Sequence, residues 1–348
     1  MNKNPNIIEK ITNSKNPYFI AEIGINHNGS ISLAKEMIDA AKENGADCVK
    51  FQSFIVNDYI SSLADKASYQ KQDGLENKSQ RDIIGESQLS IDQIIEVREY
   101  AFKKNIDFLS TPFEIKSLKS LIDIKIDGLK ISSCNLTNYP FLEEAAESKL
   151  PILLSTGMAD YIEVKKAVSI FKKNNSPLLI FQCTSNYPSK ISNANLNVIK
   201  TYQKKFSIPV GLSDHTPNNI TSIVAVALGA VAIEKHFTIS RDLPGIDQKA
   251  SIEPTELKIL IKEIRESKKS LGSYDKFRTG EENDTFKVLR RSLVASRNLQ
   301  KGEKITKEMI SIMRPGNGLT TNYMNKILGK RLNKNINKHE LFKLKDIS

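Results

Sequence analysis

The feature that most constrains the fold of this chain is a regular alternation between short apolar runs and longer amphipathic stretches. Helical periodicity marks the longer stretches, for example at residues 91–104 and 162–173, and a final helical stretch covers residues 254–269. The short runs predict eight β-strands, at residues 18–23, 48–52, 107–109, 128–131, 152–155, 178–182, 209–212 and 231–234. Eight strand–helix units within about 270 residues predict an α/β fold of the (β/α)8 TIM-barrel type, which typically has ~250 residues.

An open, doubly wound sheet is the alternative fold, because it is built from the same alternation. A dinucleotide-binding sheet of that kind carries a G-x-G-x-x-G motif after its first strand, and no such motif stands there. One connection, residues 53–89, is polar and far longer than the ~2–6 residues usual for a loop between strand and helix. We expect this connection to form a lid or an interface arm.

The 348 residues predict more than one domain. We expect the barrel at residues 1–270, a charged linker with Gly272 and Gly280 at 271–290, and a small C-terminal domain at 291–348. Residues 291–348 carry 13 basic and 4 acidic side chains, so most of the net charge of +11 lies there. A basic module of this kind binds nucleic acid or steers small anions into a cleft, and composition leaves both readings open.

Composition also bears on the compartment. No apolar run approaches the ~20 residues of a membrane span, and the first residues lack the apolar centre of a secretory signal. Three widely spaced cysteines suit reduced thiols better than a disulfide framework. We therefore expect a soluble, cytoplasmic protein without a membrane partner.

Polar residues gather where the predicted strands end, which is where barrel enzymes carry their reactive groups. Lys50 and Lys130 each end an apolar strand, where desolvation of a cation is costly unless an anion is present. Together with nearby Ser and Thr hydroxyls, they predict a phosphate or carboxylate ligand.

Two of the four histidines, His215 and His236, follow the seventh and eighth predicted strands. Neutral imidazoles on neighbouring strands can share a divalent cation, with water and substrate oxygen as further ligands. The alternatives are two hydrogen-bonded histidines, or one general base beside a bystander. His27, after the first strand, is a candidate third ligand or a partner of a sugar hydroxyl.

A set of motifs, spread in order over nearly the whole chain, resembles the sialic acid synthase family, which includes N-acetylneuraminate, legionaminate and pseudaminate synthases. The motifs are EIGINHNG at 22–29, KFQ at 50–52, STPF at 110–113, LSTGM at 154–158, GLSDHT at 211–216, EKHFT at 234–238 and RPG at 314–316. Residues 51–54 and 69–71 look closer to the legionaminate type. The C-terminal segment resembles the antifreeze-like (SAF) domain of these synthases.

The resemblance implies a condensation of phosphoenolpyruvate with an N-acetylated hexose and water, giving a nine-carbon 2-keto sugar acid and phosphate. The acceptor would be N-acetylmannosamine or a 2,4-diacetamido-6-deoxyhexose. By resemblance, His215 and His236 bind a divalent metal, typically Mn²⁺, with Mg²⁺ or Co²⁺ as alternatives. Arg314 would contact the N-acyl group in the barrel of a partner subunit, which implies a domain-swapped homodimer.

The resemblance assigns the remaining site residues in two groups. Phosphoenolpyruvate would be held by Lys50, Thr111, Lys130, Ser133, Ser155, Ser185 and Ser213. The residues that hold sugar hydroxyls or tune proton transfer would be Glu22, Gln52, Tyr187 and Asp247.

The chain also departs from the family pattern. Asn135 occupies a catalytic position at which several members have a Glu, and an amide cannot act as a carboxylate base. Glu22, Glu234 or the phosphate itself would then handle the proton of the attacking water. Phe51 stands where some members have His, Ser185 where some have Asn, and Ile246 where Pro is common, and we expect these differences near the sugar or the water.

Two other functions remain open at this point. In the first, the C-terminal module binds nucleic acid or ice and the barrel is inert. The module's only aromatic residues, Tyr323 and Phe342, argue against nucleic acid, and its strong charge argues against ice. In the second, the enzyme acts on a shorter aldose phosphate, for which we see no further cationic strand end.

Overall fold

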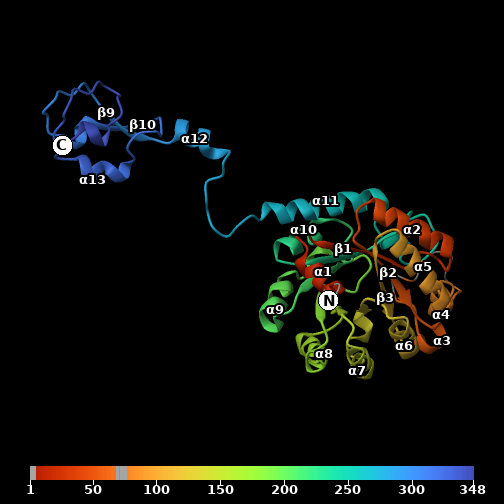
Figure 1. Cartoon of the computed structure of the whole chain (residues 1–348). Coiled ribbons are helices and arrows are strands. Elements are labelled where there is room, and N and C mark those ends of the chain that lie inside the picture. The colour runs from red at the N-terminus through yellow and green to blue at the C-terminus, as the bar shows by residue number, and fades with distance from the viewer. Residues whose placement is uncertain (1–4, 68–69, 71–76) are drawn as a thin grey trace. The chain divides into compact units, whose positions relative to one another are not determined.

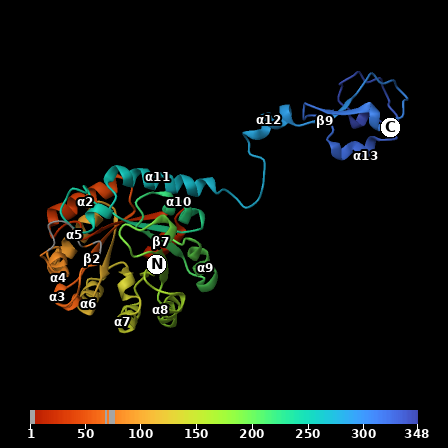
Figure 2. The same ribbon diagram turned by 180° about the vertical axis from the view of Figure 1, so that it is seen from behind.

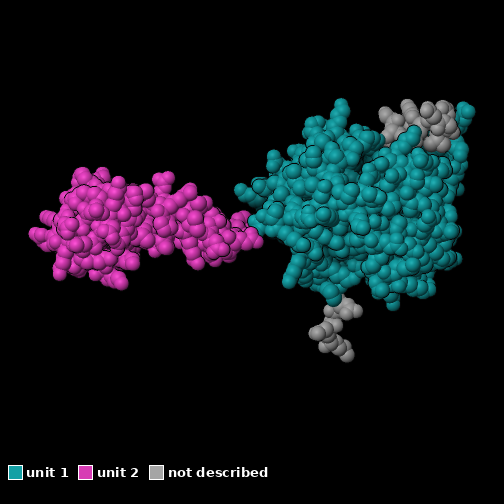
Figure 3. Space-filling model, turned by 90° about the horizontal axis from the view of Figure 1, so that it is seen from above, with its two compact units in different colours: residues 1–272 teal, residues 273–348 magenta. Residues whose placement is uncertain are grey.

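The structure is a computed structural model that describes residues 5–67, 70 and 77–348 of the chain. It divides into two compact units, residues 1–272 and residues 273–348 (Figure 3). In the described residues, no helix is long and apolar enough to cross a membrane.

The first unit is a closed barrel of parallel strands in which each strand pairs with its neighbours in sequence and β1 pairs with β8. Its strands are β1 (Tyr18–Gly24), β2 (Cys48–Ser53), β3 (Asp107–Pro112), β4 (Leu129–Ile131), β5 (Ile152–Ser155), β6 (Leu178–Cys183), β7 (Val210–Asp214) and β8 (Ala232–His236). The predicted (β/α)8 barrel is confirmed, and each predicted apolar run forms a strand.

Helices surround the barrel on its outer face (Figures 1 and 2). They are α2 (Ile31–Glu43), α5 (Ile91–Lys103), α6 (Ile115–Asp123), α7 (Tyr139–Glu147), α8 (Tyr161–Lys173), α9 (Asn197–Phe206), α10 (Ile220–Ala227) and α11 (Pro254–Ser270). Short 3-10 helices follow some strands, namely η2 (Ser133–Asn135), η3 (Ile191–Asn193) and η4 (Gln248–Ala250). The long connection between β2 and α5 contains α3 (Val56–Tyr59) and α4 (Gln80–Gly85).

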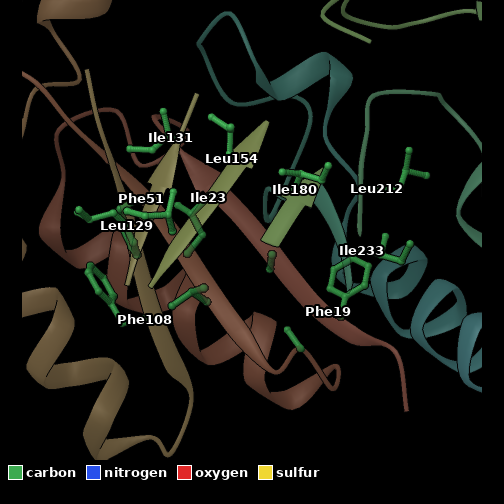
Figure 4. Packing of buried hydrophobic residues seen from close by; sticks show 14 of the residues in the cluster. Phe19, Ile23, Phe51, Phe108, Leu129, Ile131, Leu154, Ile180, Leu212 and Ile233 are labelled. Carbon is green, nitrogen blue, oxygen red and sulfur yellow. The ribbon is translucent and has the colours of Figure 1, made fainter. Parts of the chain in front are cut away.

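The hydrophobic core lies mainly between the strands and the helices. Outward-facing strand residues such as Phe19, Phe51, Leu212 and Ile233 are buried there, together with the apolar faces of the helices (Figure 4). Parallel strands buried on both faces read as nearly continuous apolar runs, which is why the sequence pattern was so clear.

The inside of the barrel changes character along each strand. At the amino-terminal end the inward residues are mainly apolar, and helix α1 (Ile7–Asn13) packs against them through Ile7, Ile8 and Ile11. Two residues further along the same inward faces, Ile20 is followed by Glu22 and Cys48 by Lys50. Asp107 accepts from the Tyr18 hydroxyl at the amino-terminal end, whereas the inward polar side chains named for the site lie at the carboxyl ends of the strands.

The second unit has its own core around β9 (Ser292–Ala295) and β10 (Ile310–Met313), which pair in antiparallel register. Its other elements are α12 (Glu282–Leu289), η5 (Lys307–Met309), η6 (Thr321–Tyr323), α13 (Met324–Ile327) and η7 (Leu344–Asp346). Helix α12 occupies part of the stretch that we expected to be a linker, so residues 271–290 are not all extended chain.

Candidate active site

A cavity of about 390 Å³ opens at the carboxyl ends of the barrel strands, which is within the usual size of a small-molecule site. Side chains from several strands and their following loops line it. Of the residues predicted for the site, the lining includes Glu22, Lys50, Gln52, Thr111, Lys130, Ser133, Ser155, Ser185, Tyr187, Ser213, His215, Glu234, His236 and Asp247. The structure thus brings together side chains that are scattered over more than 220 residues of sequence.

The two lysines lie side by side with two carboxylates. Lys50 Nζ is 2.5 Å from Glu22 Oε2 and donates a hydrogen bond to Thr111 Oγ1 at 2.9 Å. Burial acts to lower the pKa of Lys50, but the carboxylates of Glu22 and Glu234 outweigh burial and raise it. Lys50 is therefore held in its charged form at neutral pH.

The second lysine is less fully compensated. Lys130 Nζ donates to Ser155 Oγ at 2.6 Å and lies 3.4 Å from Glu234 Oε1. Burial lowers the pKa of Lys130, and the attraction of Glu234 offsets only part of that effect. An incoming anion would restore the missing compensation, which makes this end of the cavity an anion site.

The two carboxylates differ in their ionisation. Burial raises the pKa of Glu22, although Lys50 acts in the opposite direction, and Gln52 Nε2 donates to its Oε1 at 3.1 Å. Burial also acts to raise the pKa of Glu234, but Lys130 and Lys50 outweigh it and the pKa is lowered. Glu22 is therefore the carboxyl group better suited to exchange a proton, whereas Glu234 remains a carboxylate.

The hydroxyl groups of the anion site cluster around a glycine. The backbone N–H of Gly157 donates to Ser133 Oγ at 2.9 Å. A Cβ at position 157 would collide with Ser185 Oγ and would lie 2.9 Å from Ser133 Oγ. Only glycine leaves room for both hydroxyls. The LSTGM motif contains Gly157, but nothing in the sequence pattern indicated its role.

The two predicted metal ligands, His215 and His236, face each other with ring centroids 5.5 Å apart. Burial, together with the nearby cationic groups, lowers the pKa of His236 well below its ordinary value, so this imidazole is neutral and able to bind a metal. Nδ1 of His215 lies 2.8 Å from the carbonyl oxygen of Thr184, which fixes the orientation of the ring.

The donor atoms of the two histidines bear on whether the site suits a divalent cation. His236 Nδ1 is buried without a hydrogen-bond partner in the described structure, and Asp247 Oδ2 lies 3.8 Å from it. Among the described residues, no group of three or more His, Cys, Asp or Glu side chains is arranged to hold a metal. The donors fit a cation held by two imidazoles and completed by water or substrate oxygen.

The structure places His27 and Phe51 outside the described lining of the cavity. His27 is fully buried, its Nδ1 accepts from the N–H of Gly29 and its ring stacks on Phe51. Burial lowers the pKa of His27 to about 4. Phe51 packs against Phe108 on the outer face of the barrel, because strand alternation sends Lys50 and Gln52 inward and the residue between them outward.

Two further predicted residues are not among the described residues that line the cavity. The amide of Asn135 donates to the carbonyl oxygen of Phe113 at 3.1 Å, and its oxygen accepts from Asn138 at 3.2 Å. The 3-10 turn after β4 directs this side chain to the Phe113 carbonyl and to Asn138, and the catalytic role of Asn135 stays a prediction. Arg314 belongs to the second unit and is exposed there, and its proposed contact stays a prediction.

Apolar side chains also line the cavity, and of these only Ile246 was expected near the substrate from the sequence. Ile25, Ile84, Phe113 and Ile246 line it, and they belong to one hydrophobic cluster that includes residues of the connection between β2 and α5. Ile25 lies within the EIGINHNG motif, but Ile84 lies in a polar connection without recognisable periodicity. No signal in the sequence pointed to it.

Cys183 also lines the cavity and was not predicted. Its Sγ lies 4.0 Å from Nδ1 of His215. Burial acts to raise the pKa of this thiol, but His215 and Lys130 outweigh burial and lower it to about 7. All three cysteines lie in the described part of the chain and are free.

Comparisons with known proteins agree with this architecture. Residues 37–276 match the NeuB family, and residues 290–348 match the SAF domain. The chain is 39% identical over 340 residues to N,N'-diacetyllegionaminic acid synthase of Legionella pneumophila, which is 96% of both chains. It is 33% identical over 331 residues to pseudaminic acid synthase of Campylobacter jejuni, which covers 94% of this chain and 96% of that relative.

A solved structure gives the same result. The crystal structure of N-acetylneuraminic acid synthetase from Leptospira borgpetersenii, in complex with citrate, matches with a TM-score of 0.69 and 37% sequence identity. The match covers 78% of this chain and 91% of that chain. Together with the site geometry, these similarities show that the chain belongs to the NeuB family.

Proposed function

We propose that the chain is a phosphoenolpyruvate-dependent nonulosonic acid synthase, a transferase that condenses phosphoenolpyruvate with an N-acetylated hexose and water. The products are a nine-carbon 2-keto sugar acid and inorganic phosphate. One observation carries the proposal: a pair of buried lysines and a pair of imidazoles line the same cavity at the carboxyl end of the barrel. The names of the relatives support the same class of reaction.

In this proposal the anion site holds phosphoenolpyruvate. Lys50 and Lys130 pair with its phosphate and carboxylate, and the hydroxyls of Thr111, Ser155 and Ser213 add hydrogen bonds. Ser133 and Ser185 contribute from the space that Gly157 leaves open. Because these donors are fixed before the substrate arrives, they stabilise charge on the phosphate as it leaves.

His215 and His236 would hold a divalent cation, for which we propose Mn²⁺. When bound there, such a cation supplies Lewis-acid polarisation of the acceptor's carbonyl oxygen. Asp247 lies next to His236, and burial raises its pKa to about 6. This carboxyl group therefore gains or loses a proton near neutral pH and is placed to hold a sugar hydroxyl.

The bond changes assign the remaining work to the chain's own residues. C3 of phosphoenolpyruvate forms the new carbon–carbon bond to the acceptor's carbonyl carbon, whose oxygen takes up a proton. Water adds at C2, and the bond between C2 and the phosphate oxygen then breaks. Glu22, whose pKa is raised by burial, gives the proton to the acceptor's oxygen and takes up the proton that the adding water loses. Glu234 stays ionised and keeps Lys130 in place.

The apolar lining of the cavity bears on the acceptor. Ile25, Ile84 and Ile246 suit acyl methyl groups and a 6-deoxy carbon better than a phosphate group. In the described lining of the cavity, the only Lys or Arg side chains are Lys50 and Lys130, which serve the anion site. We therefore propose a 2,4-diacetamido-6-deoxyhexose as acceptor, with N-acetylmannosamine as the second candidate.

The organisation of the chain belongs to the same proposal. Residues 1–270 would be the synthase barrel, residues 271–290 a connection and residues 291–348 the antifreeze-like domain. We propose a domain-swapped homodimer in which Arg314 of one subunit completes the acceptor site of the other. The basic charge of residues 291–348 suits a domain that covers an anionic substrate.

Release of phosphate from phosphoenolpyruvate tests the proposal. The purified chain is incubated with each acceptor, with and without a chelator. We expect phosphate release that requires both substrates, is faster with the 2,4-diacetamido-6-deoxyhexose, stops on chelation and returns with Mn²⁺. Absence of acceptor-dependent release with either sugar would refute the proposed function, and equal rates in chelator would refute the metal assignment alone.

A further inference from the structure

We infer that the buried ion pair between Asp214 and Lys235 is a positioning device that sets the separation of the two cavity histidines. The ion pair lies outside the cavity. Its inferred role rests on the proposed function in one respect, namely that His215 and His236 hold a cation. Neither residue touches substrate in this account, so both are positioning residues.

Strand alternation places Asp214 and Lys235 on the outer face of the barrel wall, whereas the histidines next to them face the cavity. Asp214 is the last residue of β7 and stands between Ser213 and His215, and Lys235 stands between Glu234 and His236 on β8. The flanking residues line the cavity. Asp214 and Lys235 point the other way, where their side chains are 2% and 1% exposed and the distance from Lys235 Nζ to Asp214 Oδ2 is 3.0 Å.

Asp214 fixes the chain around His215. Its Oδ1 accepts from both the backbone N–H and the hydroxyl of Thr216, at 2.9 and 2.8 Å. Its Oδ2 accepts from the hydroxyls of Thr221 and Ser222, at 2.8 and 2.7 Å. The residues before and after His215 are thereby tied to each other and to the first turn of α10.

Lys235 ties this assembly to the neighbouring strand. Besides its contact with Asp214, its Nζ donates to the carbonyl oxygen of Thr216 at 2.6 Å. A longer contact of 3.4 Å reaches the carbonyl oxygen of Asn218. The side chain that precedes His236 therefore holds the loop that follows His215, which links the two histidine-bearing segments directly.

Stability alone does not explain a charged pair at this level of the barrel. On the same outward faces, two residues earlier, Leu212 and Ile233 fill the core with apolar side chains. A buried ion pair is commonly no more stabilising than well-packed apolar residues of similar volume, because both charges lose their hydration. What the ion pair does specifically is to fix the position of the loop relative to the strands, since each hydrogen bond requires one arrangement of strand and loop.

Geometry matters here because the described cavity offers a cation only two imidazoles. With so few protein ligands, a small change in their separation weakens binding directly. Loss of a group that orients metal ligands typically lowers metal affinity about 10–100-fold.

The test compares Mn²⁺ binding with phosphoenolpyruvate binding, both measured by isothermal titration calorimetry on the full chain. For Lys235→Met we expect the Kd for Mn²⁺ to rise about 10–100-fold, with the Kd for phosphoenolpyruvate in chelator unchanged. Phosphoenolpyruvate binding serves as the internal control, because a general loss of structure would weaken both. Arg265→Met, which removes the ion pair with Asp47 near the amino-terminal end of β2, is the matched control and should leave both affinities unchanged.

A charge-balanced variant covers the case in which Lys235→Met does not fold. Asp214→Asn combined with Lys235→Met keeps an acceptor for the hydroxyls and buries no unpaired charge. We expect this double variant to fold but to bind Mn²⁺ more weakly than wild type, because the contact from Lys235 on β8 to the loop after His215 is missing. Wild-type Mn²⁺ affinity in either folded variant would overturn the inference. Absence of Mn²⁺ binding to wild type, or wild-type binding in His215→Ala, would instead refute the proposed metal site.

Discussion

Gly157 gives the sharpest single-residue prediction for the anion site. Replacement by Ala would place a methyl group against Ser185 Oγ, 2.9 Å from Ser133 Oγ and 3.2 Å from Cys183 Sγ. Because such close contacts are not tolerated, the two hydroxyls must rotate or the loop must shift. Overpacking of this kind costs about 1–3 kcal/mol of folding stability.

The expected loss of phosphoenolpyruvate binding follows from the hydrogen bonds that the Ser133 and Ser185 hydroxyls would no longer donate. A hydrogen bond from a hydroxyl to a charged group contributes about 1.5–3 kcal/mol, and 1.4 kcal/mol is about tenfold in affinity. Gly157→Ala should therefore raise the KM for phosphoenolpyruvate about 10–100-fold, with little change in the KM for the acceptor. Steady-state phosphate release at saturating concentrations of the other substrate measures both constants.

A matched control separates this steric effect from a general effect of a methyl group. Among the described residues, a Cβ at Gly280 would meet no atom within 4 Å apart from its chain neighbours, so Gly280→Ala should leave both KM values and the melting temperature unchanged. A wild-type KM for phosphoenolpyruvate in Gly157→Ala would refute the assignment of Ser133 and Ser185 to the anion site.

Three further predictions address the acid–base state, the metal site and the assembly. Burial raises the pKa of Asp247 from 3.8 to about 6, so between these values the folded chain holds a proton that the unfolded chain has lost. The free energy of unfolding should therefore fall as pH rises from about 4 to 6, by about 3 kcal/mol for this group. Asp247→Asn should flatten that slope in thermal melts of the metal-free chain, and an unchanged slope would contradict the assignment. His215→Ala and His236→Ala should abolish phosphate release while circular dichroism stays at wild type, and full turnover in either would remove the metal assignment. If Arg314 acts across subunits, Arg314→Ala should raise the KM for the acceptor. Mixing this variant with inactive Lys130→Met subunits should recover activity at wild-type KM, because each intact barrel then receives Arg314 from its partner. Absence of recovery from verified mixed dimers would argue against an exchange of domains between subunits.

The barrel was predictable because its strands are buried on both faces and leave a clear signature in the sequence. The polar strand ends followed from the same pattern, since two residues along one inward face separate apolar Ile20 from Glu22. Pattern alone therefore indicated which level of the barrel carries the site, and the resemblance supplied the proposed roles.

Side-chain direction outside the strands was not predictable in the same way. Asn135 and His27 both follow a strand, but each is turned by its loop into backbone hydrogen bonds or aromatic packing. The period of two that orients residues within a strand does not extend into a loop. The pairing of Lys50 with Glu22 was missed for a related reason, because adjacency across neighbouring strands depends on the register of the strands.

The central claim is that the lysine pair and the imidazole pair serve one reaction in one cavity. Paramagnetic broadening of the ³¹P signal of phosphoenolpyruvate by Mn²⁺ bound to the chain tests it most directly. We predict strong broadening in wild type, its loss in His236→Ala with phosphoenolpyruvate still bound, and its loss in Lys130→Met with Mn²⁺ still bound. Phosphoenolpyruvate and Mn²⁺ bound together without any broadening of the phosphorus signal would contradict the claim.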